Sequence, residues 1–299
     1  MILLTGATGA VGARVLDQLL QAGHRVRCLV RDPTRLGARR VDVQLALWTL
    51  TDQRLPGGAL RGVDTVVHLA GPLHDQATGT LEELNVTASW RLADAAARAG
   101  VGHFVHVSAL GAGQAAGCRF LRAKEAGERV VAGAGAVGGM EVTIAAPSLV
   151  LARGHRWAWW AQALSLLPVT PIPRGTTGRS APIAADDVAA ALVALVENGP
   201  QSLAGAGTTP HRVELAGPRT YAVRELVPEL QAAVGRPRRP LVPMPLGVLR
   251  VATAALERPG VAERDELALI TCDTAGRRGT ADAEALGVRP RALIDALAA

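Results

Sequence analysis

A glycine-rich segment near the start of the chain has the residue types and spacing of a phosphate-binding loop. Glycines allow a tight turn and a close backbone approach, and the first amide groups of a following helix can bind a pyrophosphate. A glycine-rich turn that binds nothing is the alternative, but a strand pattern before the segment and a helical pattern after it favour a dinucleotide site. The predicted contacts are consecutive residues, Gly6, Ala7, Thr8, Gly9, Ala10, Val11 and Gly12.

The residues at the end of the second predicted strand bear on which dinucleotide is bound. Arg31 follows Gly12 by 19 residues. Near this position an acidic residue would accept the ribose hydroxyls of NAD, whereas an arginine suits the 2′-phosphate of NADP. Asp32 follows directly and Arg35 adds positive charge, so the signal is mixed. The position of Arg31 favours NADP(H), with NAD(H) as the second choice.

The elements that must position these residues alternate between strand and helix patterns. Apolar runs predict strands over 2–5, 25–30, 41–47, 65–70, 103–108 and 141–146, with helical spacing of apolar residues between several of them. Such alternation predicts an α/β fold, a doubly wound parallel sheet of the Rossmann type with helices on both faces.

The second half of the chain loses this rhythm, because prolines and glycines interrupt it from about residue 153. We predict a dinucleotide-binding domain over residues 1–152 and a smaller, interleaved α/β substrate domain over residues 153–299. A helix over 186–198, with Asp186 as its expected N-cap, is predicted to return to the first domain. A short strand over 211–216 and a helix over 223–234 are also predicted.

Composition excludes several classes of protein. The chain has 299 residues, 49% apolar and 19% charged, which excludes disorder and a small disulfide-stapled fold. The net charge is +6, but arginines are scattered and aromatic residues make up only 3%, so no nucleic-acid surface is predicted. No apolar run of about 18 residues predicts a membrane span. Three distant cysteines fit a reducing cytoplasm, and no spacing predicts a metal site.

Several motifs together resemble the short-chain dehydrogenase/reductase family, in its extended or atypical branch. Besides the glycine loop they are Leu29-Val30-Arg31-Asp32-Pro33, Gly62-Val63-Asp64-Thr65-Val66-Val67-His68-Leu69-Ala70-Gly71, Phe104-Val105-His106-Val107-Ser108-Ala109, the pair Phe120 and Lys124, and Gly217-Pro218-Arg219-Thr220-Tyr221. The last motif and the layout are similar to the NmrA-like group, which includes the accessory subunit of respiratory complex I. The resemblance spans nearly the whole chain and is most specific in its first half.

The resemblance implies roles for individual residues at the cofactor. The glycine loop would hold the pyrophosphate and Arg31 the 2′-phosphate, while Ala70 and Gly71 would border the adenosine. Leu50 is a further predicted cofactor contact. Lys124 would hold the nicotinamide ribose, and Pro147 would line the nicotinamide pocket. Lys124 is also the only lysine of the chain, which favours a specific role over chance retention on an exposed helix.

The chain departs from the family at the catalytic position. Phe120 occupies the tyrosine slot of the Tyr-x-x-x-Lys motif, and a phenyl ring has no proton to give to a developing alkoxide. The proton would then be supplied by one of three groups: Ser108, a water molecule or His74. In active relatives the serine at the position of Ser108 orients the substrate carbonyl. Thr49 and Ala146 also replace family residues, an aspartate near the adenine and an arginine before Pro147, which would only modulate binding.

A cluster of tryptophans follows the sixth predicted strand, where relatives build a substrate lid. Trp157, Trp159 and Trp160 would suit an apolar or planar ligand. A subunit contact or a local core is an equal alternative, and membrane attachment is a weaker one. The predicted substrate contacts are Phe120, Ser148, Trp157 and Trp160.

The sequence therefore predicts a cytoplasmic, NADP(H)-binding atypical short-chain dehydrogenase/reductase that reduces an apolar small molecule without the usual tyrosine. The alternative is a non-catalytic protein that keeps the nucleotide as a structural element or as a redox sensor. Lys124, Ser108 and His74 are the candidate catalytic residues.

Overall fold

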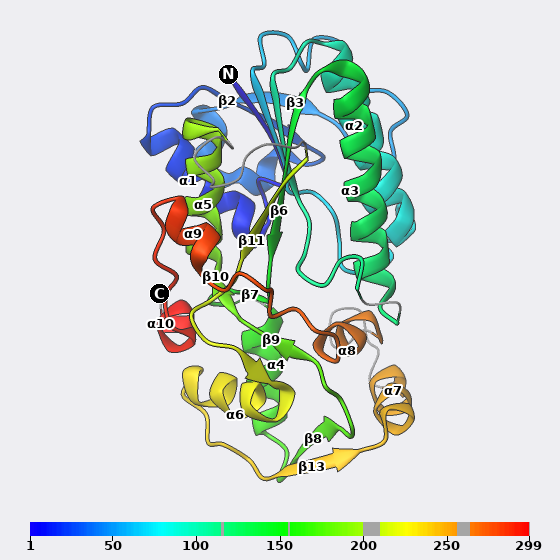
Figure 1. Cartoon of the computed structure of the whole chain (residues 1–299), viewed down its shortest axis with the longest axis vertical. Helices are drawn as coiled ribbons and strands as arrows, with labels where there is room; N and C mark the ends of the chain where they lie inside the picture. Colours follow the sequence, from blue (N-terminus) through cyan, green and yellow to red (C-terminus); the bar gives the residue numbers. More distant parts are fainter. Residues whose placement is uncertain (115–116, 155, 200–209, 256–263, 299) are drawn as a thin grey trace.

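The computed structural model describes residues 1–114, 117–154, 156–199, 210–255 and 264–298 (Figure 1). Seven parallel strands form its central sheet, in the order β11-β6-β5-β4-β1-β2-β3. Their bounds are β1 (Ile2–Thr5), β2 (Val26–Val30), β3 (Gln44–Leu47), β4 (Thr65–His68), β5 (His103–Val107), β6 (Glu141–Pro147) and β11 (His211–Leu215). The order reverses between β1 and β4, which places a ligand crevice at the carboxyl ends of these strands. The predicted doubly wound α/β fold is confirmed.

The central strands are buried on both faces, which explains their unbroken apolar runs. Leu3 packs into the core on one face and Leu4 into the core on the other, and Phe104 and Val105 divide in the same way. Alternate side chains of a strand point to opposite faces of a sheet. Alternate apolar side chains of the same strand therefore contribute to the cores on the two faces of the sheet.

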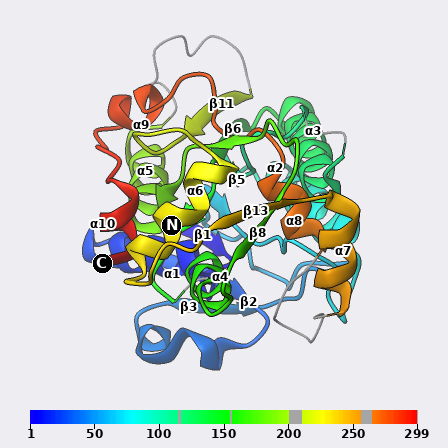
Figure 2. The ribbon, with the colours of Figure 1, turned by 90° about the horizontal axis from the view of Figure 1, so that it is seen from below.

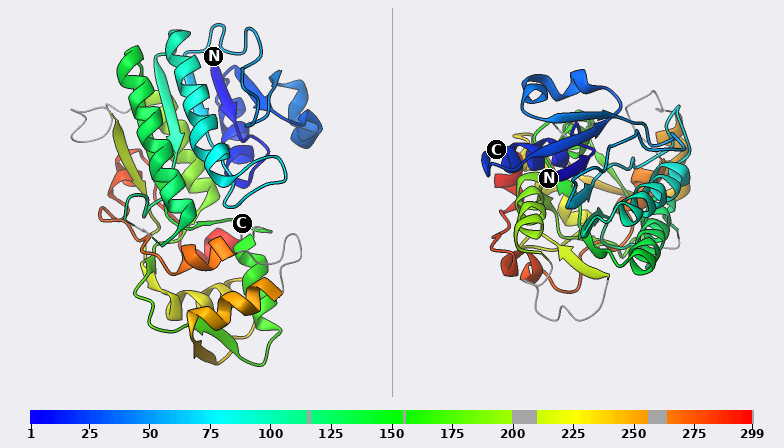
Figure 3. Two further views of the ribbon diagram at one scale, coloured as in Figure 1. Left: turned by 90° about the vertical axis from the view of Figure 1, so that its right-hand side faces the viewer. Right: turned by 90° about the horizontal axis from the view of Figure 1, so that it is seen from above.

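Four helices cover the two faces of the sheet (Figures 1 and 3). On one face α1 (Ala10–Gln21) packs against α5 (Ala185–Asn198), and on the other α2 (Ala88–Arg98) packs against α3 (Arg119–Gly138). Asp186 does not cap α5 as expected, because the N-cap is Ala184. The Asp186 carboxylate instead accepts a hydrogen bond of 2.8 Å from Arg14 Nε, so it ties α5 to α1.

The strand predicted over 41–47 begins later than expected. Residues Pro33–Val41 form a 3₁₀ segment, η1, whose N-cap is Asp32. The Asp32 side chain accepts a bond from Thr34 N, and Pro33 stands at the first helical position, where its ring and missing N–H are tolerated. Gly37, with a φ of +60°, divides this segment, and Val41 belongs to its second piece, so β3 begins only at Gln44.

A smaller lobe lies at the carboxyl ends of the sheet strands, as the view from below shows (Figure 2). It contains α4 (Arg156–Ser165), β8 (Thr170–Pro173), β9 (Arg179–Ser180), β12 (Tyr221–Ala222), α6 (Val223–Ala233), β13 (Leu241–Met244), α7 (Leu246–Ala255) and α8 (Arg264–Ile270). Near the junction lie β7 (Val150–Leu151), β10 (Ile183–Ala184) and α10 (Leu293–Ala298), while α9 (Ala281–Ala285) packs on β11. None of the helices in the described ranges is long and apolar enough to cross a bilayer.

Candidate functional site

The glycine loop makes a tight turn between β1 and α1. Gly6 has a φ of +72°, and a Cβ on it would lie 2.9 Å from the backbone nitrogen of Ala70. A Cβ on Gly12 would overlap the carbonyl oxygen of Gly6. No described side chain caps the start of α1, and its first turn carries no acidic residue. The backbone amides and the positive end of the helix dipole are therefore available to an anion.

A cavity of about 380 Å³ opens in front of this loop and runs along the carboxyl ends of β1, β2 and β4. Of the predicted cofactor residues, seven line it: Gly6, Thr8, Gly9, Arg31, Leu50, Ala70 and Gly71. Ala7, Ala10, Val11 and Gly12 are not among its lining residues. Ala7 is buried and Gly12 packs on the loop backbone, so these two residues shape the turn.

The far end of this first cavity carries positive charge. Arg31 and Arg35 line it, together with Asp32. One Asp32 carboxylate oxygen accepts bonds from the hydroxyl (2.6 Å) and the backbone nitrogen (3.0 Å) of Thr34, and these bonds lower the pKa of Asp32. The ionised Asp32 offsets one of the two arginines, so this end of the cavity carries a net charge of +1.

Lys124 lies between the first cavity and Phe120. Its side chain is 5% exposed, and Nζ donates a hydrogen bond of 3.1 Å to the carbonyl oxygen of Val107. Nζ also lies 5.7 Å from the centre of the Phe120 ring and 3.0 Å from the place that a Cβ on Gly71 would take. Burial lowers the pKa of Lys124 to about 8, against the opposing charge of Glu128. Lys124 itself lines neither cavity, and its ammonium lies beside Gly71, which lines the first one.

Asn85, which the sequence did not signal, lies beside Gly71 at the border of the site, although it lines neither cavity. It lies in the π-helical turn η2 (Glu83–Thr87), a type of turn that is frequent at functional sites. Its Nδ2 donates to the carbonyl oxygens of Pro72 and Leu81, both at 3.0 Å. Its buried Oδ1 accepts no bond from the described residues, and a Cβ on Gly71 would overlap it. Only the polar residue type within an apolar helical pattern could have signalled it.

Two buried histidines lie beneath the site rather than in it. His68 bonds to the hydroxyls of Thr5 (2.7 Å) and Ser89 (3.0 Å), and its ring stacks on His106 with centres 5.5 Å apart. Burial lowers the pKa of His68 to about 3 and holds that of His106 well below its usual value. Both imidazoles are therefore neutral near pH 7.

A second cavity, of about 180 Å³, brings together residues that are far apart in the sequence. Five of the predicted site residues line it: Ser108, Phe120, Pro147, Ser148 and Trp157. Pro147 therefore faces this cavity and not the first one. Trp160 lines neither cavity, although it lies on α4 with Trp157. Leu73, Leu269, Ile270 and Thr274 were not predicted, because they come from a loop and from the last part of the chain.

The hydroxyl groups of the second cavity are bonded to the protein itself. Ser148 donates to the Thr274 carbonyl oxygen (2.6 Å) and accepts from the backbone nitrogen of Ala181 (3.1 Å). The Thr274 hydroxyl donates to Ser180 (2.9 Å), and the Ser108 hydroxyl donates to Glu128. The cavity consequently presents a mainly apolar surface.

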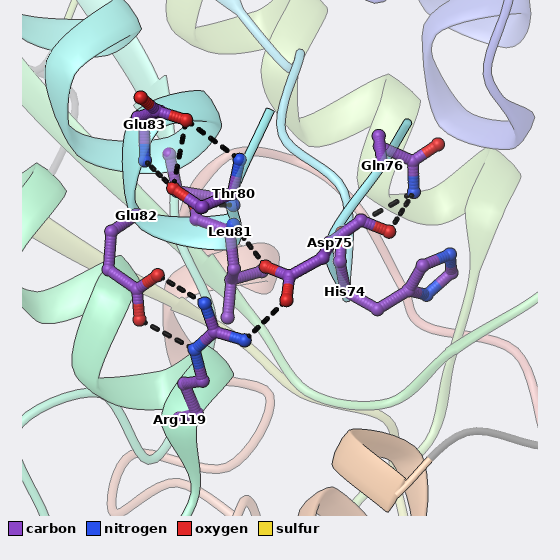
Figure 4. A network of polar contacts seen from close by, with 9 residues as sticks. His74, Asp75, Gln76, Thr80, Leu81, Glu82, Glu83 and Arg119 are labelled. Carbon is purple, nitrogen blue, oxygen red and sulfur yellow. Dashed lines mark hydrogen bonds and ion pairs between the residues drawn. The ribbon is translucent and has the colours of Figure 1, made fainter. Parts of the chain in front are cut away.

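The loop over residues 72–80 borders both cavities and is clamped to α3 (Figure 4). Arg119 donates to both oxygens of Glu82, at 2.7 and 2.5 Å, and to Asp75 Oδ2 at 2.8 Å. The other Asp75 oxygen accepts from Leu81 N at 2.6 Å. His74 lies on the same loop but lines neither cavity. Asp75 points toward Arg119, and the His74 ring points away from Arg119 (Figure 4).

We expect Arg119→Gln to loosen this loop and to weaken ligand binding at both cavities. A bidentate arginine pair fixes geometry that an amide cannot reproduce. The dissociation constant for NADPH should rise by roughly threefold to tenfold, since partly exposed ion pairs contribute about 1 kcal/mol. Calorimetric titration measures it, and Arg129→Gln is the matched control because it breaks an ion pair with Glu125 on the same helix. Equal affinities in the two variants would contradict the clamp.

The chain has sequence and structural relatives of known activity. Residues 2–206 match the model of the NAD dependent epimerase/dehydratase family. The chain is 32% identical to the (4-alkanoyl-5-oxo-2,5-dihydrofuran-3-yl)methyl phosphate reductase of Streptomyces griseus subsp. griseus, over 88% of this chain and 84% of that protein. It is 30% identical to the NAD(P)H azoreductase of Xenophilus azovorans, over 80% and 76%. An NADPH-dependent quinone oxidoreductase from Escherichia coli shares the fold, with a TM-score of 0.76, 18% identity and coverage of 100% and 99%.

Proposed function

The chain belongs to the NAD dependent epimerase/dehydratase family, and we propose that within it the protein is an NADP(H)-dependent reductase of a small apolar molecule. The family match confirms the predicted resemblance to the extended short-chain dehydrogenases/reductases. Two relatives are named reductases, one of them for NAD(P)H, which supports an oxidoreductase and favours it over the non-catalytic alternative. The observation that carries the proposal is the pair of adjoining cavities, with the loop over residues 71–73 bordering both.

The first cavity fits a dinucleotide phosphate in shape and charge. Its glycine wall leaves no room for a Cβ at Gly6, and the amides at the start of α1 face the same space. Arg31 and Arg35 would bind the 2′-phosphate at the far end, while Lys124 beside Gly71 would hold the nicotinamide ribose. When bound, NADPH supplies a hydride, and the remaining tasks fall to the protein's own side chains.

The second cavity supports an apolar and planar substrate. Phe120 and Trp157 contribute aromatic surface to it, and Leu73, Leu149 and Leu269 add aliphatic surface. Because Phe120 has no proton to give, the proposal assigns the proton of the reduced product to solvent or to the substrate. Conjugated acceptors, whose reduced forms are delocalised anions, meet that condition best. We also propose a cytoplasmic location, because the chain has only three cysteines, Cys28, Cys118 and Cys272, which are too few for a disulfide framework.

The direct test is to identify the nucleotide that purifies with the protein by mass spectrometry, and then to follow NADPH consumption. The substrate panel should contain quinones, activated alkenes and azo compounds, with simple ketones as the comparison. We expect bound NADP(H) and turnover of the conjugated compounds. A protein that binds neither nucleotide would overturn the proposal.

We expect the unmodified protein to bind NADPH more tightly than NADH, and Arg31→Ala to remove most of that preference. A charge-assisted contact to a phosphate contributes about 1–3 kcal/mol, which corresponds to a loss of roughly fivefold to 150-fold in NADPH affinity. NADH affinity should hardly change. Arg40→Ala is the control, because Arg40 is exposed nearby but lines neither cavity. Equal affinity of the unmodified protein for both nucleotides would end this assignment.

A further inference from the structure

The carboxylate of Glu128 joins the second cavity to the edge of the sheet. One oxygen, Oε1, accepts the hydrogen bond of the Ser108 hydroxyl, and the other, Oε2, accepts from Arg212 at 2.5 Å. Glu128 lies one turn after Lys124 on α3, and Arg212 lies on β11, which pairs with β6. The Glu128 side chain is 16% exposed. Both of its oxygens are thus engaged by groups from different elements.

The direction of the Ser108 bond follows from the chemistry of its partner. An ionised carboxylate can only accept hydrogen bonds, and a serine hydroxyl has a single hydrogen and two lone pairs. The hydrogen of Ser108 therefore points toward Glu128. Ser108 also lines the second cavity. We take its Oγ to face that cavity, and on that side the oxygen offers lone pairs and no hydrogen.

We propose that Glu128, held in place by Arg212, is a positioning residue that makes Ser108 a hydrogen-bond acceptor toward the substrate cavity. This point of the cavity then recognises a hydroxyl or N–H group of an otherwise apolar ligand, and it disfavours a bare carbonyl oxygen, which would face lone pairs. The inference rests on the proposed function in one respect, because it takes the second cavity as the substrate cavity.

Glu128→Gln is the variant that reverses the bond while keeping its geometry. A glutamine has the same size, and its amide oxygen can still accept from Arg212. Its amide nitrogen can donate to Ser108. The Ser108 hydrogen is then available to the cavity, so the preference of this point should change from donor ligands toward acceptor ligands.

The experiment measures binding of two probes with the same skeleton, 1-phenylethanol and acetophenone, by calorimetry in the absence of nucleotide. The unmodified protein should bind the alcohol more tightly, by roughly fivefold to tenfold for one hydrogen bond. Glu128→Gln should abolish or invert this ratio. A ketone bound as tightly as the alcohol by the unmodified protein would overturn the inference, as would a failure of both probes to bind. A variant that weakens both probes equally would show only a structural role for Glu128, and it would overturn the inference too.

A double-mutant cycle separates the effect on Ser108 from an effect through Lys124, since Glu128 also raises the pKa of that lysine. In a Ser108→Ala background, Glu128→Gln should no longer change the ratio of the two affinities. If the same change persists there, Glu128 acts by another route and the proposal is wrong. Should Glu128→Gln not fold, Ser108→Ala alone decides, because it must erase the preference for the alcohol.

These measurements distinguish the inference from the proposed function. The probe ratio is determined without nucleotide or turnover, whereas the proposed function requires NADPH binding. Loss of the probe preference with intact NADPH binding would overturn the role of Glu128 alone. Absence of NADPH binding would overturn the proposed reductase and leave the probe ratio as an independent result.

Discussion

Gly12→Ala is expected to remove detectable NADPH binding and to destabilise the folded protein. The added Cβ would overlap the carbonyl oxygen of Gly6 and lie 3.0 Å from Ala7 Cα, so either the loop or the start of α1 must move. Overpacking against backbone typically costs about 1–3 kcal/mol, and the backbone here has no flexible side chain that could yield. Because the same movement displaces the amides that face the first cavity, NADPH affinity should fall by about a hundredfold or more, equivalent to about 3 kcal/mol. Calorimetry and thermal unfolding measure the two effects.

Gly133→Ala is the matched control for this substitution. Gly133 is an exposed glycine of α3, and no atom of the described residues, apart from its own helix backbone and chain neighbours, lies within 4 Å of the place that its Cβ would take. Alanine is favoured over glycine in a helix by about 1 kcal/mol, so this variant should be as stable as the unmodified protein or more stable. If Gly12→Ala proved equally harmless, the loop would not have the tight geometry described above.

Phe120→Tyr is expected to create or raise the reduction of simple apolar ketones such as acetophenone. Phe120 lines the second cavity, and the Lys124 ammonium lies 5.7 Å from the centre of its ring. A nearby positive charge favours the ionised form of a phenol, which makes a tyrosine there a better acid. General acid catalysis is worth about 10²–10⁴-fold, so that even partial restoration is detectable as NADPH consumption.

The control for this variant is Phe120→Leu, which changes the shape of the cavity without adding a proton donor. It should show no gain with the ketone. A folded, NADPH-saturated Phe120→Tyr protein that remains inactive across a range of ketones would contradict a cavity arranged for carbonyl reduction. It would leave conjugated acceptors, which need no protein acid, as the substrates to pursue.

The sequence alone determined the framework of the nucleotide site. The glycine loop, the strand before it and the helix after it are signalled by neighbouring residues, because the turn and the two periodicities are local properties of the backbone. The same holds for Arg31, whose place at the end of a strand follows from the order of the elements. The doubly wound sheet was predictable for this reason, down to strand bounds that differ by one to three residues at individual ends.

Only the tertiary structure decided which side chains meet at the second cavity. Ser108, Trp157 and Thr274 come from distant parts of the chain, and their meeting depends on how the smaller lobe packs against the ends of the strands. His74 and Trp160, which sequence position placed in the site, line neither cavity. Position along the chain gives the loop or the helix on which a side chain lies but not the direction in which packing turns it.

The hydrogen-bond partners of polar side chains could not be predicted from the sequence either. Asp32 stood where it could bind a ribose, and in the structure one of its oxygens, Oδ1, accepts two bonds from Thr34. The sequence did not signal Glu128, because its two bonding partners are far from it along the chain. Ser108 follows the end of β5, and Arg212 lies on β11. A hydrogen bond between distant residues forms only when the fold brings a donor and an acceptor within about 3 Å. The chemistry of the second cavity therefore depends on tertiary packing, whereas the glycine loop is predictable because its residues are consecutive in the sequence.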